Sequence, residues 1–302
     1  MPDILQKATP MAKKIFIEIE KIFQTGLQNE SIVEKFESCL KNLYELDRTN
    51  YFQLQFDRMQ SIYSCIGTDS TLQGRSRIKP YGYAGDFNII DKIYTNYISD
   101  DPYCAQWDKY FHEQKAPNAV RNRKKYFIDL LNSNIDIKST SSILNLASGP
   151  GRDMLEYLDI SNNKNVHFDC VELDNNAIDY AGNLLSNYKD QVNFTNKNIF
   201  RFTPDRKYDI IWSAGLFDYF DDKTFVRILG ILISTNPEAK IVIGNFSDAN
   251  PTQPYMEIIG EWFLNYRSSE RLIEMAVEAG ADIESVKVEC EEEKVNLFLH
   301  IN

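Results

Sequence analysis

The chain has 302 residues, 43% of them hydrophobic, which is enough apolar material for one large domain or two smaller ones. Its formal net charge of −11 argues against a nucleic-acid partner, because phosphate binding needs a basic surface. No apolar run approaches the roughly 18 residues of a membrane span, and the N-terminus shows no secretory signal. We therefore expect a cytoplasmic protein without a membrane span.

Cysteine and histidine are too scattered to indicate a metal site. The five cysteines form no C-x-x-C pair, and the three histidines have no H-E-x-x-H spacing. We expect neither a bound metal nor a disulfide framework. Cys170 lies inside an apolar run and is predicted to be a core residue.

Residues 11 to 138 have a helical pattern. Apolar residues recur at helical spacing in MAKKIFIEIEKIF, and again from Ile32 to Leu43. Ser31 and Glu34 fit a capping box at the start of the second of these segments. The sequence thus predicts a helical N-terminal domain over residues 1–138.

The segment KPYGYAGD, residues 79–86, is rich in turn formers. Gly82 and Gly85 permit tight turns, Tyr83 brings a hydroxyl, and Asp86 a fixed acceptor. Two interpretations stay open. In one, this is a packed loop whose Asp86 caps a helix that begins near Phe87. In the other, it is a lid that excludes water from a ligand, with Tyr83 and Asp86 as catalytic candidates.

From residue 139 the pattern changes to short apolar runs that alternate with amphipathic helices. The runs are 143–147, 168–173, 208–212 and 241–246, and the helices between them include 177–188 and 224–233. This alternation predicts β-α-β units around a parallel sheet. Apolar residues alternate with polar ones over 286–290 and 295–301, which predicts a closing hairpin. We expect a doubly wound, Rossmann-like α/β domain over residues 139–302, with a seven-stranded sheet that ends in an antiparallel hairpin.

The first strand runs into Ser148, Gly149, Pro150 and Gly151. A turn with so few Cβ atoms lets backbone approach a ligand and directs helix N–H groups at it. Glu172, 21 positions beyond Gly151, ends the second strand, where an acidic side chain can bind ribose hydroxyls. A dinucleotide fingerprint would need glycine at position 154, which is Met154, so the pattern favours a nucleoside cofactor without a pyrophosphate.

The segments ILNLASGPGRD, CVELD and YDIIWSAGLFDYF resemble motifs I, II and IV of class I methyltransferases. The resemblance implies S-adenosylmethionine as the cofactor. Two positions depart from the motif: Asn145 replaces the usual acid, which removes a charge that would favour the methionyl ammonium, and Ala147 replaces the first glycine. The cofactor-binding candidates that follow are Asn145, Ala147, Ser148, Gly149, Gly151, Glu172, Leu173, Asn198, Ile199 and Ala214.

A narrower resemblance covers most of the chain. IKPYGYAGDFNIIDKIY, AVRNR, SGPGRD, GLFDYF, NFSDANP and EWFLNYRS together look like the family assigned to biosynthesis of the extracellular factor 3-hydroxypalmitic acid methyl ester. This resemblance implies a small-molecule acceptor, a hydroxy acid methylated on its carboxylate. A carboxylate needs no general base, which suits a chain with three histidines.

The remaining candidates follow the fourth and fifth strands or lie on a basic helix. Asp218 and Tyr219 are catalytic candidates, although Asp218 could instead cap the next helix. Phe217 could line an apolar channel, and Arg123 or Arg267 could receive a carboxylate. Tyr266 is a substrate-binding candidate, with a positioned loop as the alternative for Tyr266 and Arg267.

Other functions stay open from the sequence. They are O- or N-methylation of another metabolite, an NAD-dependent reductase, and a binding module without catalysis. A DNA adenine methyltransferase is disfavoured, because no [DN]-P-P-[YFW] tetrapeptide follows the fourth strand. The sequence does not indicate an oligomeric state.

Overall fold

The computed structural model describes residues 10–46 and 51–302. The chain forms two compact units. Unit 1 comprises the chain up to Pro117 together with residues 251–263, and unit 2 comprises residues 118–250 and 264–302. The helical region therefore ends earlier than the expected residue 138, and it takes in a short segment from late in the chain.

Unit 1 is helical. Its helices are α2 (Pro10–Thr25), α3 (Glu30–Leu46), α4 (Tyr51–Gln60), α5 (Ser64–Gly67), α6 (Leu72–Ile78), α7 (Phe87–Tyr94), α8 (Pro102–Glu113) and α13 (Gln253–Ile258). The rings of Phe23 in α2 and Phe36 in α3 each lie 5.4 Å from that of Trp107 in α8, edge to face. The helical periodicity thus predicted the buried faces of α2 and α3. The α3 cap is Asn29, whose side chain accepts from the Ile32 N–H, and not Ser31.

Segment 251–263 is held to α6 by buried polar contacts. Arg77 donates to the carbonyls of Ile258 and Ile259, at 3.3 Å each. The Ser76 hydroxyl donates to the Gly260 carbonyl at 2.9 Å. Because these partners are some 180 residues apart in the chain, no local sequence pattern could reveal them.

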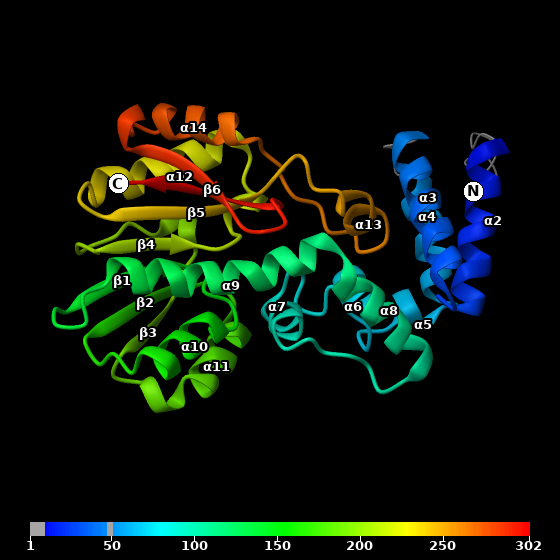
Figure 1. Cartoon of the computed structure of the whole chain (residues 1–302), viewed down its shortest axis with the longest axis horizontal. Helices are drawn as coiled ribbons and strands as arrows, with labels where there is room; N and C mark the ends of the chain where they lie inside the picture. Colours follow the sequence, from blue (N-terminus) through cyan, green and yellow to red (C-terminus); the bar gives the residue numbers. More distant parts are fainter. Residues whose placement is uncertain (1–9, 47–50) are drawn as a thin grey trace. The chain divides into compact units, whose positions relative to one another are not determined.

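Unit 2 contains a seven-stranded sheet in the order β3-β2-β1-β4-β5-β7-β6 (Figure 1). The strands are β1 (Ser141–Leu146), β2 (Val166–Glu172), β3 (Val192–Asn196), β4 (Ile210–Ser213), β5 (Lys240–Phe246), β6 (Val286–Cys290) and β7 (Asn296–Ile301). Strands β1 to β5 are mutually parallel, and β7 runs antiparallel to both β5 and β6. The predicted doubly wound sheet and its closing hairpin are confirmed.

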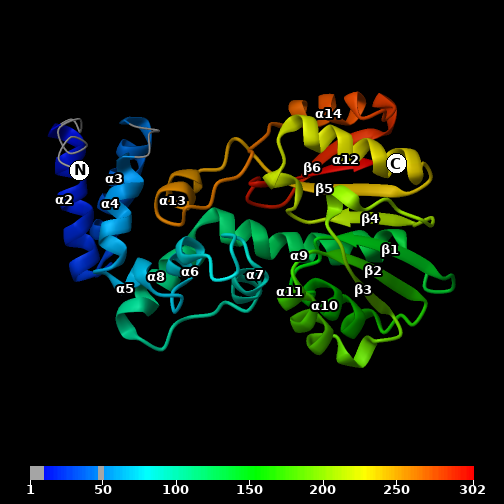
Figure 2. The same cartoon turned by 180° about the vertical axis from the view of Figure 1, so that it is seen from behind.

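Helices cover both faces of this sheet (Figures 1 and 2). They are α9 (Lys115–Asn134), α10 (Arg152–Ser161), α11 (Asn175–Leu184), α12 (Asp222–Thr235) and α14 (Ser269–Glu278), with the short turns η1 (Ser186–Tyr188), η2 (Ile199–Arg201), η3 (Phe217–Tyr219) and η4 (Ile283–Ser285). Leu144 belongs to the core beneath α12 and α14, whereas its neighbour Ile143 belongs to the core beneath α9 and α10. Successive side chains of β1 point to opposite faces of the sheet and so contribute to both cores.

The second half of helix α9 packs on the sheet. The ring of Phe127 lies 5.0 Å from that of Trp212 in β4, and Leu131 is fully buried in the same core. We had expected residues 118–134 to belong to the N-terminal domain. A helical pattern alone does not say which surface the apolar face will cover.

In the described part of the chain, no helix is both long and apolar enough to cross a membrane. The same residues contain no cluster of three or more His, Cys, Asp or Glu side chains able to hold a metal ion.

Replacing Arg77 by Leu should lower the free energy of unfolding by about 3 kcal/mol, because the buried carbonyls and the partners Asp57 and Glu261 lose their cation. Urea denaturation measures the loss. The control Arg58→Leu alters an exposed position on α4 and should cost at most about 0.5 kcal/mol. Equal losses in the two variants would show that segment 251–263 does not depend on Arg77.

Candidate functional site

The strand order places a topological switch point between β1 and β4. The chain leaves β1 towards β2 and β3, and then returns past β1 to β4 and β5. The connections on either side of β1 therefore diverge at the carboxyl ends of β1 and β4, which is where doubly wound sheets bind ligands. The glycine-rich turn follows β1, and the Ala214–Gly215 turn follows β4 at this same edge.

The turn after β1 is built from left-handed backbone. Ala147, Gly149 and Gly151 have φ angles of +53°, +56° and +71°. The Ala147 N–H donates to the Val171 carbonyl at 2.8 Å, which fixes the start of the turn on β2. Only glycine adopts such angles without strain, so Ala147 carries a strained conformation in place of the first glycine of the motif.

Glu172 fastens this turn to the end of β2. Its Oε2 accepts from the Gly149 N–H at 3.0 Å, and its Oε1 accepts from the N–H groups of Leu173 and Asp174 at 2.8 and 3.1 Å. Burial raises the pKa of the Glu172 carboxyl, and the three N–H groups oppose this shift. The ribose contact of Glu172 stays a prediction; the structure shows that this side chain organises the loop.

The two glycines of the turn have different surroundings. A Cβ built on Gly149 meets no atom within 4 Å, whereas one on Gly151 lies 3.0 Å from Leu185, 3.2 Å from Met154 and 3.3 Å from Ala181. Gly151 thus permits close packing of α10 on α11. Gly149 is the position that leaves space for a ligand beside the backbone.

One buried donor at the end of β1 has no partner in the described structure. The side chain of Asn145 is 1% exposed, and its Nδ2 makes no hydrogen bond to any described residue. An unsatisfied buried amide costs about 1–3 kcal/mol, which a ligand acceptor would recover. Together with the space beside Gly149 and the Glu172 carboxylate, this donor fits the amino-acid end and the ribose of S-adenosylmethionine.

The other predicted cofactor residues lie at the same sheet edge. Leu173, directly after β2, is 61% exposed, and Ile199 is half-buried after β3. The Asn198 side chain accepts from the Phe200 N–H at 2.9 Å and so caps η2. Ser148 is buried in the turn, and Ala214 is partly exposed after β4. For Leu173 we predicted only a contact with the cofactor; an exposed apolar side chain at this edge suits a flat adenine ring.

Arg123 and Asp218 form the polar side of the β4 turn. The Nη1 of Arg123 donates to the Ala214 carbonyl at 3.3 Å. A Cβ on Gly215 would lie 2.9 Å from that nitrogen and 3.5 Å from Asp218 Oδ2, so glycine is what lets the two charges share this space. Burial raises the pKa of Asp218 to about 7, against the opposing influence of the Phe246 N–H, Arg123 and Arg267.

Arg267 is occupied by the protein itself. It pairs with Asp222 at 3.0 Å, and donates to the Asn245 side chain and to the carbonyls of Phe217, Phe220 and Asn265. Its guanidinium also lies over the Phe225 ring. These contacts support the alternative interpretation, a positioned loop, over receipt of a substrate carboxylate.

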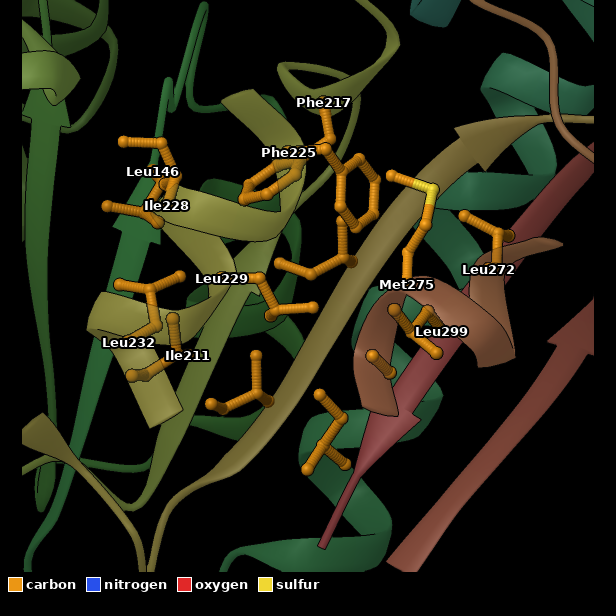
Figure 3. Close-up of a cluster of buried hydrophobic side chains, with 14 of the residues drawn as sticks. Leu146, Ile211, Phe217, Phe225, Ile228, Leu229, Leu232, Leu272, Met275 and Leu299 are labelled. Carbon is orange, nitrogen blue, oxygen red and sulfur yellow. The ribbon is translucent and has the colours of Figure 1, made fainter. Parts of the chain in front are cut away.

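Phe217 is a core residue and does not line a channel. Its ring is fully buried and makes edge contacts with Phe220 and Phe225, beneath α12 and α14 (Figure 3). Tyr219, the exposed residue of η3, and the half-buried Tyr266 stay candidates for acceptor contact. A position after a strand predicts the sheet edge but not the direction of the side chain, which is why Phe217 was misplaced.

The other two catalytic candidates lie in unit 1. Asp86 is fully buried, caps α7 through the Ile89 N–H at 2.8 Å, and pairs with Arg75 at 3.2 Å. The capping interpretation of Asp86 is therefore confirmed. Tyr83 is half-buried in the loop. A lid role for the loop stays a prediction.

Sequence reasoning missed Asp153, in the first turn of α10. It is 6% exposed, and burial raises its pKa to about 6, while the Met154 N–H, Arg123 and Lys124 oppose the shift. Its burial could have been predicted from helical spacing, because Asp153 lies one turn before the buried Tyr157, on the face of α10 that packs against the sheet.

No protein-family model and no curated protein matches the chain. Similar solved structures include a possible exported protein from Bordetella parapertussis, 16% identical over 72% of this chain and 78% of that chain, with a TM-score of 0.60. A "putative O-methyltransferase" from Nostoc punctiforme is 13% identical over 62% of this chain and 57% of its own, less than two thirds, with a TM-score of 0.50. At these identities the likeness shows the fold alone, a Rossmann-like seven-stranded sheet with surrounding helices.

The strain at Ala147 gives a test of the turn. Ala147→Gly should raise the free energy of unfolding by about 0.5–1 kcal/mol, since relief of the left-handed strain exceeds the added chain entropy. Urea denaturation measures the change. The control Ala177→Gly, in α11, should lower stability; a loss of similar size at Ala147 would contradict the strain.

The raised pKa of Asp218 gives a pH dependence. The folded value of about 7 lies above the unfolded one, so the stability from its protonated form is present at low pH and is lost as pH rises through 7. Asp218→Asn keeps the acceptor for the Phe246 N–H. Between pH 5 and pH 8 the variant should lose about 3 kcal/mol less free energy of unfolding than the parent, as measured by denaturation at both values. Parallel pH profiles would contradict a buried titrating Asp218.

Proposed function

We propose that this protein is an S-adenosylmethionine-dependent methyltransferase that acts on a small molecule. The observation that carries the proposal is the turn after β1, where open space beside Gly149 lies next to a buried unpartnered donor of Asn145 and the fixed carboxylate of Glu172. The methyltransferase fold and the sequence motifs support the same cofactor. The missing third glycine, at Met154, disfavours a nicotinamide dinucleotide.

The chain's own groups would bind and align the reactants. Glu172 can accept from ribose hydroxyls through lone pairs that its backbone donors leave free, because each carboxylate oxygen has two acceptor sites. Leu173 offers an apolar face to the adenine. When bound, the cofactor supplies an electrophilic methyl group, and the protein accelerates transfer by aligning the acceptor behind it and limiting water.

For the acceptor, we propose an oxygen nucleophile, and more narrowly the carboxylate of a 3-hydroxy fatty acid. The acceptor oxygen forms a bond to the methyl carbon while the carbon–sulfur bond breaks, with its electron pair going to sulfur. A carboxylate thus gives a neutral methyl ester with no proton to remove. The sequence resemblance and the low histidine content support this choice. Arg123, which already donates to the Ala214 carbonyl beside Asp218, is the candidate cation of the β4 turn for such a substrate.

A substitution at Gly149 tests the cofactor site. Gly149→Val should abolish binding of S-adenosylhomocysteine, measured by calorimetry, because its side chain would fill the open space beside the turn. The left-handed backbone makes any side chain there strained, so Gly149→Ala serves as the matched variant with less bulk. The Ala variant should retain more affinity than the Val variant. Unchanged affinity in both, or tighter binding of NADH by the parent, would contradict the proposal.

The acceptor is tested by incubating the protein with labelled cofactor and a chain-length series of 3-hydroxy acids. Formation of a base-labile methyl ester would support the carboxylate acceptor. Transfer to an amine or a phenol, with no ester from any acid, would contradict it and leave the cofactor assignment standing.

A further inference from the structure

The end of β1 lacks the negative charge that the class I motif usually places there. Its residue is Asn145, a neutral amide whose buried Nδ2 has no partner among the described residues. The methionyl end of the cofactor carries both a carboxylate and an ammonium. An amide N–H can donate to the carboxylate, but it cannot balance the ammonium charge.

Asp153 and the side chain of Asn145 lie on the same side of the sheet, the side covered by α9 and α10. Asn145 is two residues beyond Ile143, so both side chains point to the face covered by α9 and α10. Asp153 is one turn before Tyr157, whose ring packs 6.2 Å from that of Phe168 on that face. The start of α10 directly follows the glycine turn. The Asp153 side chain thus points towards the sheet, next to the glycine turn beside which the cofactor would bind.

The Asp153 carboxylate is held by local backbone donors. Its Oδ1 accepts from the Met154 N–H at 2.9 Å. The nearest cationic influences are Arg123 and Lys124, and Arg123 also acts on Asp218. The positive charge of Arg123 is therefore shared between two buried carboxyl groups, those of Asp153 and Asp218. With a pKa of about 6 the Asp153 carboxyl is mostly ionised at neutral pH, and a buried carboxylate needs a cationic partner.

We propose that Asp153 binds the ammonium of the cofactor's methionyl group and replaces the acid that Asn145 does not supply. Asn145 Nδ2 then donates to the methionyl carboxylate. The negative charge that the class I motif places at the end of the first strand is in this chain supplied instead from the first turn of α10. This inference rests on the proposed cofactor.

Calorimetry with two ligands tests it. S-adenosylhomocysteine carries the ammonium and the carboxylate, whereas 5′-methylthioadenosine has the same nucleoside and a thioether but neither charged group. Asp153→Asn should weaken S-adenosylhomocysteine about tenfold to a hundredfold, the range for a hydrogen bond to a charged group, and leave 5′-methylthioadenosine unchanged. Because Asn keeps an acceptor for the Met154 N–H, the variant should fold; Asp153→Ser, which also keeps one, should show the same selective loss.

A charge swap and a matched control complete the design. Adding Asn145→Asp to Asp153→Asn should restore part of the affinity for S-adenosylhomocysteine, since it moves the acid back to the strand. Asp179→Asn removes an exposed charge from α11 and should change neither affinity.

Equal losses for the two ligands in Asp153→Asn would assign Asp153 a structural role and overturn the inference, as would unchanged affinity for S-adenosylhomocysteine. If the parent protein itself binds neither ligand, the proposed function fails. Those results are distinct, because the first two require a parent that binds.

Discussion

The carboxylate of Glu172 holds together the two loops on which the candidate site depends. It closes the end of β2 on its own following residues and, through Gly149, fixes the glycine turn that follows β1. Without this acceptor three partly buried backbone N–H groups at the sheet edge would lose their partner, at a cost of about 0.5–1.5 kcal/mol each. The left-handed geometry of Ala147, Gly149 and Gly151 would also lose its restraint. Binding and folding therefore share one side chain, and Glu172→Ala would not report on ribose contact alone.

Much of unit 2 could be predicted from the sequence because its signals are local. The short apolar run of β5, buried on both faces, and the period-two alternation of residues along β6 depend only on neighbouring residues. The placement of α9 and of residues 251–263 could not be predicted in this way. An amphipathic helix such as α9 shows an apolar face but not its partner, and the Arg77 contacts join α6 to carbonyls far along the chain.

The candidate site shows the same division. The glycine turn and Glu172 could be predicted from the sequence. A glycine-rich turn after a strand, followed by an acidic residue at the end of the next strand, has few purely structural explanations. Phe217 was misplaced because a position after a strand does not say which way the side chain points, and its packing on Phe225 decides this. For Arg267 the sequence left two interpretations open, and its contacts with carbonyls of Phe217 and Phe220 support the positioned loop. Asp153 was overlooked since an acid in the first turn of a helix is ordinary, and only its burial makes it unusual.

Segment 251–263 has a consequence for synthesis of the chain. Helix α13 packs on α3, and the carbonyls of Ile258 and Gly260 accept hydrogen bonds from Arg77 and Ser76 of α6. These residues are synthesised only after β5. During translation the Arg77 Nη1 group and the Ser76 hydroxyl therefore lack these acceptors until residues 118–250, more than half of unit 2, have been made. The helical unit can therefore complete its packing only late in synthesis, although most of it is encoded first.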